Sequence, residues 1–163
     1  MKSLLLSLDH WITGLCHHVA SALMVIVACL GLWQVVTRFV FSEPSVWTEE
    51  IMRRLLIWMV MLGTVVAVRK GALVSVDLML RLSRGAWRRV VRGVITGVHL
   101  SFFGVLVWFG FDLVWRVRYQ TFASMELSMG WAYAAVPVGA LLAILATLAQ
   151  HVDPQNEELA NAQ

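Results

Sequence analysis

The chain has 163 residues, of which 60% are hydrophobic and only 14% are charged. A soluble domain carries about 45–50% apolar and about 25% charged residues, so this chain has too little polar surface to cover a soluble globule. An intrinsically disordered chain is excluded because such chains are poor in apolar residues, and two cysteines are too few for a disulfide scaffold. The composition therefore predicts an integral membrane protein.

Near the N-terminus, a short apolar run over residues 4–8 is interrupted by Asp9 and His10. A longer apolar run follows without a break, which favours an uncleaved first membrane span over a cleaved leader.

Four apolar segments are long enough to cross the hydrocarbon core, which takes about 20 residues of helix. They cover residues 19–37, 51–68, 94–115 and 130–150. The predicted fold is therefore all-α, with one four-helix membrane domain over residues 1–150 and a polar cytoplasmic tail over residues 151–163. Pro137 lies inside the fourth span, where its missing N–H predicts a kink.

The polar stretch between the second and third spans has helical periodicity. Asp77, Arg81 and Arg84 recur at helical spacing, and Leu73 and Leu80 fall on another face. This pattern is typical of an interfacial amphipathic helix. The alternative is a cytoplasmic extension of the second span.

The basic residues flank the apolar runs and do not form one patch, so the net charge of +3 and the isoelectric point near 9.3 do not indicate nucleic-acid binding. We expect contact with membrane lipids and none with nucleic acid. Eight cations lie on the side that holds the segment between the second and third spans, and five lie on the other side. By the positive-inside rule, both termini are expected in the cytoplasm.

No motif indicates catalysis: there is no phosphate loop, metal motif or nucleophile elbow, and the span centres are uncharged. Asp112 precedes Arg116 by four residues, which favours an ion pair over a proton relay. We therefore expect neither an enzyme nor a cofactor bound by this chain, but a part of a larger complex. His17, His18 and His99 leave one alternative open, a haem-binding membrane anchor of a respiratory oxidoreductase.

The densest polar cluster lies at the start of the second span. Glu49 stands four residues before Arg53, and this acid-first order suits a helix N-terminus. Glu50 stands in the same relation to Arg54. The cluster either caps a helix end at the interface or contacts another subunit, and the spacing leaves both readings open.

Three spans also carry stripes of small residues, which permit close contact between helices in a membrane. These stripes are Gly63, Ala67 and Gly71; Gly93, Gly97 and Ser101; and Ala135, Gly139 and Ala143.

Short motifs follow one another in a fixed order along the chain. They are Arg38-Phe39-Val40-Phe41, Trp47-Thr48-Glu49-Glu50, Trp58, Gly63, Arg69, Val76-Asp77, Gly130-Trp131-Ala132-Tyr133 and Pro137-Val138-Gly139. Together they resemble the small membrane subunit of the tripartite ATP-independent periplasmic (TRAP) transporters, the DctQ-like family, over residues 19–150. Leu73 departs from that pattern, because the family commonly has a His there.

The resemblance implies a non-catalytic small permease subunit in a bacterial inner membrane. It would scaffold the large TRAP membrane subunit, which takes up an organic acid delivered by a periplasmic substrate-binding protein. Cation coupling, usually to sodium, is expected in that large subunit. The candidate subunit contacts or interface anchors in this chain are Arg38, Trp47, Glu49, Glu50, Arg53, Arg54, Trp58, Gly63, Arg69, Asp77, Pro137 and Gly139.

Overall fold

The structure is a computed structural model that describes residues 2–41, 46–71, 86–121 and 128–153. Its helices are α1 (Lys2–Phe39), α2 (Val46–Arg69), α4 (Ala86–Val117), α5 (Met129–Tyr133) and α6 (Ala135–Val152). Four helical stretches in this part of the chain are long and apolar enough to cross a membrane, and each contains one expected span. The all-α, four-span fold is therefore confirmed. The expected interfacial helix around Asp77 lies outside the described residues.

The first helix is much longer than its expected span. α1 begins at Lys2 and has 38 residues, and neither Asp9 nor His10 interrupts it. A helix of this length extends about 57 Å, whereas the hydrocarbon core is about 30 Å thick. The apolar run marks the part of a helix that suits the bilayer, and it does not mark the ends of the hydrogen-bonded backbone.

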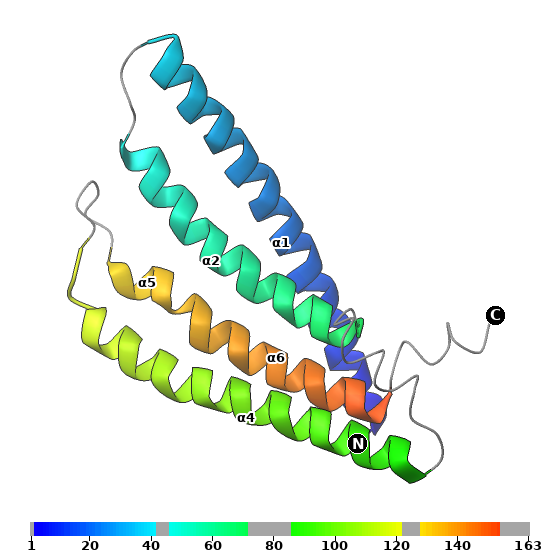
Figure 1. Cartoon of the computed structure of the whole chain (residues 1–163). Helices are drawn as coiled ribbons and strands as arrows, with labels where there is room; N and C mark the ends of the chain where they lie inside the picture. The colour runs from blue at the N-terminus through cyan, green and yellow to red at the C-terminus, as the bar shows by residue number, and fades with distance from the viewer. Residues whose placement is uncertain (1, 42–45, 72–85, 122–127, 154–163) are drawn as a thin grey trace, which may run out of the picture.

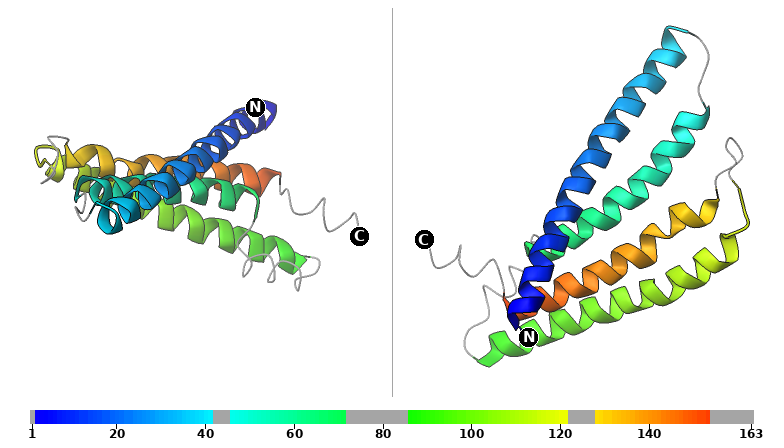
Figure 2. Two further views of the ribbon diagram at one scale, coloured as in Figure 1. Left: turned by 90° about the horizontal axis from the view of Figure 1, so that it is seen from above. Right: turned by 180° about the vertical axis from the view of Figure 1, so that it is seen from behind.

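The four long helices lie side by side in the order α1, α2, α6, α4, as Figure 1 shows. α2 packs between α1 and α6, and α6 packs between α2 and α4. Within the described residues, α1 and α4 have no backbone contact with each other. The N-terminal part of α1 crosses the C-terminal part of α6, so the helices converge at that end and spread at the other (Figure 2).

α6 is the central packing element because its buried positions are small. Ala135, Gly139, Ala140, Ala143 and Ala146 are all buried. Small side chains let neighbouring backbones approach, and this gains dispersion energy in a bilayer where no hydrophobic force favours helix association. The predicted small-residue stripe of the fourth span therefore packs inside this chain.

The fourth span is interrupted one turn before Pro137. α5 ends at Tyr133 and α6 begins at Ala135, with Ala134 between them. A proline has no N–H to donate to the carbonyl four residues earlier, which here belongs to Tyr133. Val138 still donates to the carbonyl of Ala134 at 3.2 Å, so the helix resumes at once. The break occurs where the proline predicts a kink.

Candidate functional site

Arg69 is the last residue of α2 and lies at the converging end of the structure. Gly71, with φ of 59°, ends the helix in the left-handed conformation that glycine adopts readily. The Arg69 Nε donates to a carboxylate oxygen of Asp9 on α1. One terminal nitrogen donates to Gln150 Oε1 at 3.0 Å and to the Asp153 carbonyl at 2.8 Å. We call Arg69, Asp9, Gln150 and Asp153 the Arg69 cluster. The end of the molecule where they lie is called the Arg69 end.

The ion pair in the Arg69 cluster is buried, because the side chains of Arg69 and Asp9 are only 4% and 6% exposed. Thr13 donates to the other oxygen of Asp9 at 3.3 Å, and Asp153 Oδ2 lies 3.4 Å from Arg69. A buried charge is tolerated when it is paired and hydrogen-bonded. The cluster is therefore satisfied within the chain, and it ties α1, α2 and α6 together.

Sequence reasoning placed Arg69 among the candidate residues but missed Asp9, which it treated as a break in an apolar run. The signal that could have found Asp9 was an acid directly after the apolar run that ends at Leu8 and two residues before Trp11, where the next apolar run begins. Such an acid requires a partner. The identity of that partner depends on how α1 crosses the other helices, which the sequence does not reveal.

The opposite end, which we call the Glu49 end, contains both expected ion pairs. Glu49 pairs with Arg53 at a site where both side chains are about half exposed or more. Glu50 and Arg54 lie 3.8 Å apart, and their side chains are only 17% and 20% exposed. Thr48, one turn before Met52, is fully buried. The Glu50 pair is thus the more enclosed of the two, which spacing alone could not distinguish.

Aromatic residues gather around α5, beside the middle of α2 and the last turns of α4. Trp58 on α2 packs against Trp131 on α5 with ring centroids 5.9 Å apart. The Arg118 guanidinium lies 3.7 Å from the ring centroid of Trp115 and 4.5 Å from that of Tyr119. Trp115 and Trp131 are both more than half exposed. Exposed aromatic rings are enriched at membrane–water interfaces.

The glycines divide into those that contact another helix of the chain and those that do not. A Cβ atom at Gly139 would lie 2.6 Å from Met61 Cβ, and one at Gly110 would lie 3.0 Å from Pro137. A Cβ at Gly63, or at Gly93 and Gly97, would meet no atom within 4 Å. Gly63 of the α2 stripe and Gly93 and Gly97 of the α4 stripe therefore have open space beside them in the described part of the chain, whereas Gly139 of the α6 stripe does not.

The sequence-predicted anchors do not form one site. Arg69 and Glu49 lie at opposite ends of α2, about 30 Å apart at the rise of a helix. Arg38 and Trp47 are exposed near the ends of α1 and α2 that face each other at the Glu49 end. Asp77 lies outside the described residues.

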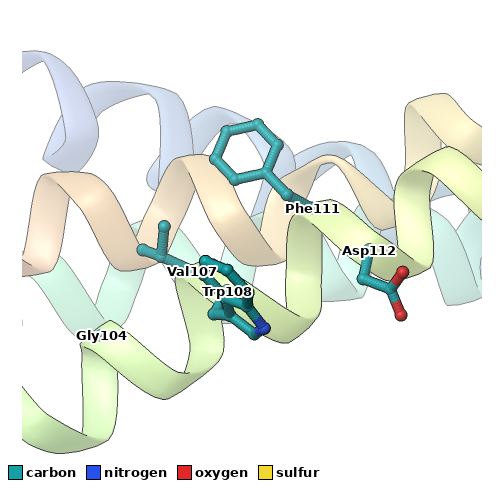
Figure 3. A pocket seen from close by; sticks show the side chains of 5 residues that line it. All are labelled: Gly104, Val107, Trp108, Phe111 and Asp112. Atoms are coloured by element: carbon teal, nitrogen blue, oxygen red, sulfur yellow. The ribbon is translucent and has the colours of Figure 1, made fainter.

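A depression on α4 is lined by Gly104, Val107, Trp108, Phe111 and Asp112, and Figure 3 shows these side chains. All five belong to one helix, so the depression is a surface feature and not an enclosed cavity. Asp112 also pairs with Arg116 at 2.8 Å, as its spacing predicts. Ligand sites usually bury most of their ligand between several elements, and this depression does not.

The histidines are not brought to one place. His17 and His18 lie next to each other on α1, and His99 packs on Phe103 of α4. α1 and α4 have no backbone contact in the described residues. Among those residues no group of three His, Cys, Asp or Glu could hold a metal ion. Nothing in this arrangement favours the haem-anchor alternative.

The fold and these contacts define a multi-pass membrane protein whose described acidic residues all pair within the chain. The family model of the tripartite ATP-independent periplasmic transporters, DctQ component, matches residues 27–155. The chain therefore belongs to the DctQ family of TRAP transporter components.

Two relatives were found among characterised proteins. The sialic acid TRAP transporter small permease protein SiaQ of Vibrio cholerae is 24% identical over 127 residues, which is 77% of this chain and 73% of SiaQ. The sialic acid TRAP transporter permease protein SiaT of Haemophilus influenzae is 27% identical over 135 residues. That match covers 83% of this chain but only 21% of SiaT.

Proposed function

We propose that this chain is the non-catalytic small permease subunit of a TRAP-type secondary transporter. It scaffolds a large membrane subunit in the bacterial inner membrane, with both of its own termini in the cytoplasm. The large subunit carries out the cation-coupled uptake, with sodium as the expected ion. The substrate is an organic acid that a periplasmic binding protein delivers.

The observation that carries this proposal is the open arrangement of the helices. The order α1, α2, α6, α4 leaves α1 and α4 at the two flanks, and both carry large exposed apolar side chains, such as Met24, Leu32, Trp108 and Phe109. Transporter sites are typically built near the midplane from broken helices and polar or charged groups. The described ion pairs of this chain lie toward the ends of its helices. A scaffold needs packing surface and no transport site, and the described residues are consistent with that role.

The relationship to SiaT supports a large-subunit partner. The matched segment makes up about a fifth of that permease. A segment similar to this chain is therefore part of one polypeptide with a much larger permease region in that relative. This supports the proposal that the segment described here associates with a large permease region.

The test is co-purification. The tagged chain is produced together with the large TRAP subunit from the same source, and the complex is isolated in a mild detergent. We expect the two chains to elute as one species. Elution of the large subunit without this chain, under conditions where both are present in the membrane, would contradict the proposal. A visible absorption spectrum of the same sample should lack a Soret band, and a strong one would instead favour a haem protein.

A further inference from the structure

The depression on α4 is an open, mostly apolar surface with a volume of about 450 Å³. It lies at one flank of the helix row, since among the described helices α4 contacts only α5 and α6. A Cβ atom at Gly104 would meet no atom of another described element within 4 Å. Trp108 and Phe111, which also line the depression, are 76% and 54% exposed. The depression (Figure 3) is therefore open toward the hydrocarbon of a surrounding bilayer.

A cationic group lies at the rim of the depression. Asp112 lines the depression and accepts a hydrogen bond from Arg116 Nε at 2.8 Å. This bond holds the guanidinium of Arg116 beside the rim. The pair uses one of the five N–H donors of the guanidinium, and the Arg116 side chain is 73% exposed. Donors of Arg116 are therefore available to a phosphate that approaches from outside the protein.

The distance between the depression and Arg116 matches one leaflet of a bilayer. At the rise of a helix, Phe111 lies about 7 Å and Gly104 about 18 Å before Arg116 along α4. One leaflet contributes about 15 Å of hydrocarbon. Trp115, the neighbour of Arg116, is 69% exposed, and exposed tryptophans favour the headgroup region. The depression thus lies at the depth of acyl chains when Arg116 lies at the level of lipid phosphates.

We propose that the α4 depression holds an acyl chain of a membrane phospholipid and that the guanidinium of Arg116 binds the phosphate of the same lipid. The apolar surface and the cation follow each other along α4 in the order that chain and phosphate have in a leaflet. A soluble ligand would stay largely uncovered in so open a depression. Neighbouring lipids cover the rest of a phospholipid. Every residue of the site belongs to this chain, so the proposal does not depend on a partner subunit.

The test measures the lipid that the full-length chain retains after purification in a mild detergent. Equal amounts of phosphatidylethanolamine and of diacylglycerol with the same acyl chains are added, and the bound lipid is identified by native mass spectrometry. The wild type should retain phosphatidylethanolamine in clear excess. Arg116→Gln should lower the retention of phosphatidylethanolamine about tenfold, since a hydrogen bond to a charged group contributes about that factor. It should leave the retention of diacylglycerol unchanged.

A second variant tests the acyl-chain part of the site. Gly104→Leu places a side chain in the depression and should lower the retention of both lipids. Gly97→Leu is its matched control, because a Cβ at Gly97 also meets no atom of another described element and Gly97 lies outside the depression. The control should retain both lipids as the wild type does. An equal loss in Gly97→Leu and Gly104→Leu would overturn the proposal.

Arg53→Gln is the matched control for the phosphate part. Arg53 pairs with Glu49 four residues earlier, and the exposures of that pair, 68% and 49%, nearly equal the 73% and 49% of Arg116 and Asp112. Arg53 does not border the depression, so its change should not affect the lipid preference. Equal retention of both lipids by the wild type would contradict the proposal, and so would an equal effect of Arg53→Gln. A dimer of the chain that Gly104→Leu abolishes would assign the depression to a second copy instead.

Discussion

Arg69 and Asp9 form a buried ion pair although they lie 60 positions apart in the chain. The pair joins the end of α2 to the first turns of α1, at the place where α1 crosses α6. Gln150 and Asp153 extend the same contacts to α6. The shape of the molecule, convergent at one end and spread at the other, is therefore fixed by polar contacts as well as by apolar packing.

The first prediction concerns the stability that this pair provides. Arg69→Met should lower the free energy of unfolding by about 3–5 kcal/mol, because it leaves the buried Asp9 carboxylate without a cation. Asp9→Asn should cost less, because Asp153 still pairs with Arg69. Unfolding in detergent, followed by circular dichroism against added denaturant, measures the loss. Asp112→Asn, which breaks the exposed pair with Arg116, is the control and should cost about 1 kcal/mol or less. An equal loss of stability in Arg69→Met and in the control Asp112→Asn would contradict the assignment of Arg69 as the central contact.

The second prediction separates the glycines. Gly139→Leu should destabilise the isolated chain by about 1–3 kcal/mol, because even a Cβ there would collide with Met61. Gly63→Leu should leave the isolated chain nearly as stable as the wild type, because a Cβ at that position would meet no atom of another described element within 4 Å. If α2 docks on the large subunit through this stripe, Gly63→Leu should still weaken co-purification. Thermal unfolding of each variant and its yield of complex are the two measurements.

The stripes of α2 and α6 have the same small-residue spacing in the sequence, yet among the described residues Gly139 of α6 contacts Met61 whereas Gly63 of α2 has open space beside it. Which stripe becomes internal depends on the order α1, α2, α6, α4, and helix order is not encoded in periodicity. The four spans and the break near Pro137 could be predicted, because they depend on local apolarity and on one missing N–H. The pairing of Asp9 with Arg69 could not, because it depends on where two distant helices cross.

The candidate site was predictable only where its contacts are local in the sequence. The ion pairs of Glu49 and Glu50 are local, with partners four residues away, and spacing was enough to find them. Their different burial was not predictable, since it arises from neighbouring helices. Gly63 was selected by its place in a small-residue stripe and in the family resemblance, and the structure adds that a Cβ there would meet no atom of another described element.

The third prediction addresses the Glu49 end. Glu49→Lys together with Glu50→Lys places four cations in the first turns of α2, against the helix dipole and against both ion pairs. We expect a loss of folding or of assembly with the large subunit, while substrate capture by the binding protein stays unchanged. Exchanging the partners, with Glu49→Arg and Arg53→Glu, keeps the charge total and should be milder. If the double lysine variant still co-purified with the large subunit, the charged residues at the start of α2 would be only a solvated helix end and not a subunit contact.

The fourth prediction concerns orientation in the membrane. Eight of the thirteen cations lie on the side of the segment between the second and third spans, which predicts a cytoplasmic location for that side. A reporter that is active only in the periplasm should be silent when fused at Gln163 and active when inserted near Ser124. Activity at Gln163 would reverse the proposed orientation.

The most direct test of the proposed scaffold role is uptake by proteoliposomes supplied with the substrate-loaded binding protein and a sodium gradient. Three samples are compared: the large subunit alone, this chain alone, and the two together. We predict full uptake for the complex, weak or absent uptake for the large subunit alone, and none for this chain alone. The binding protein should capture substrate equally in all three samples. Full uptake by the large subunit alone, or any substrate transport by this chain alone, would contradict the account.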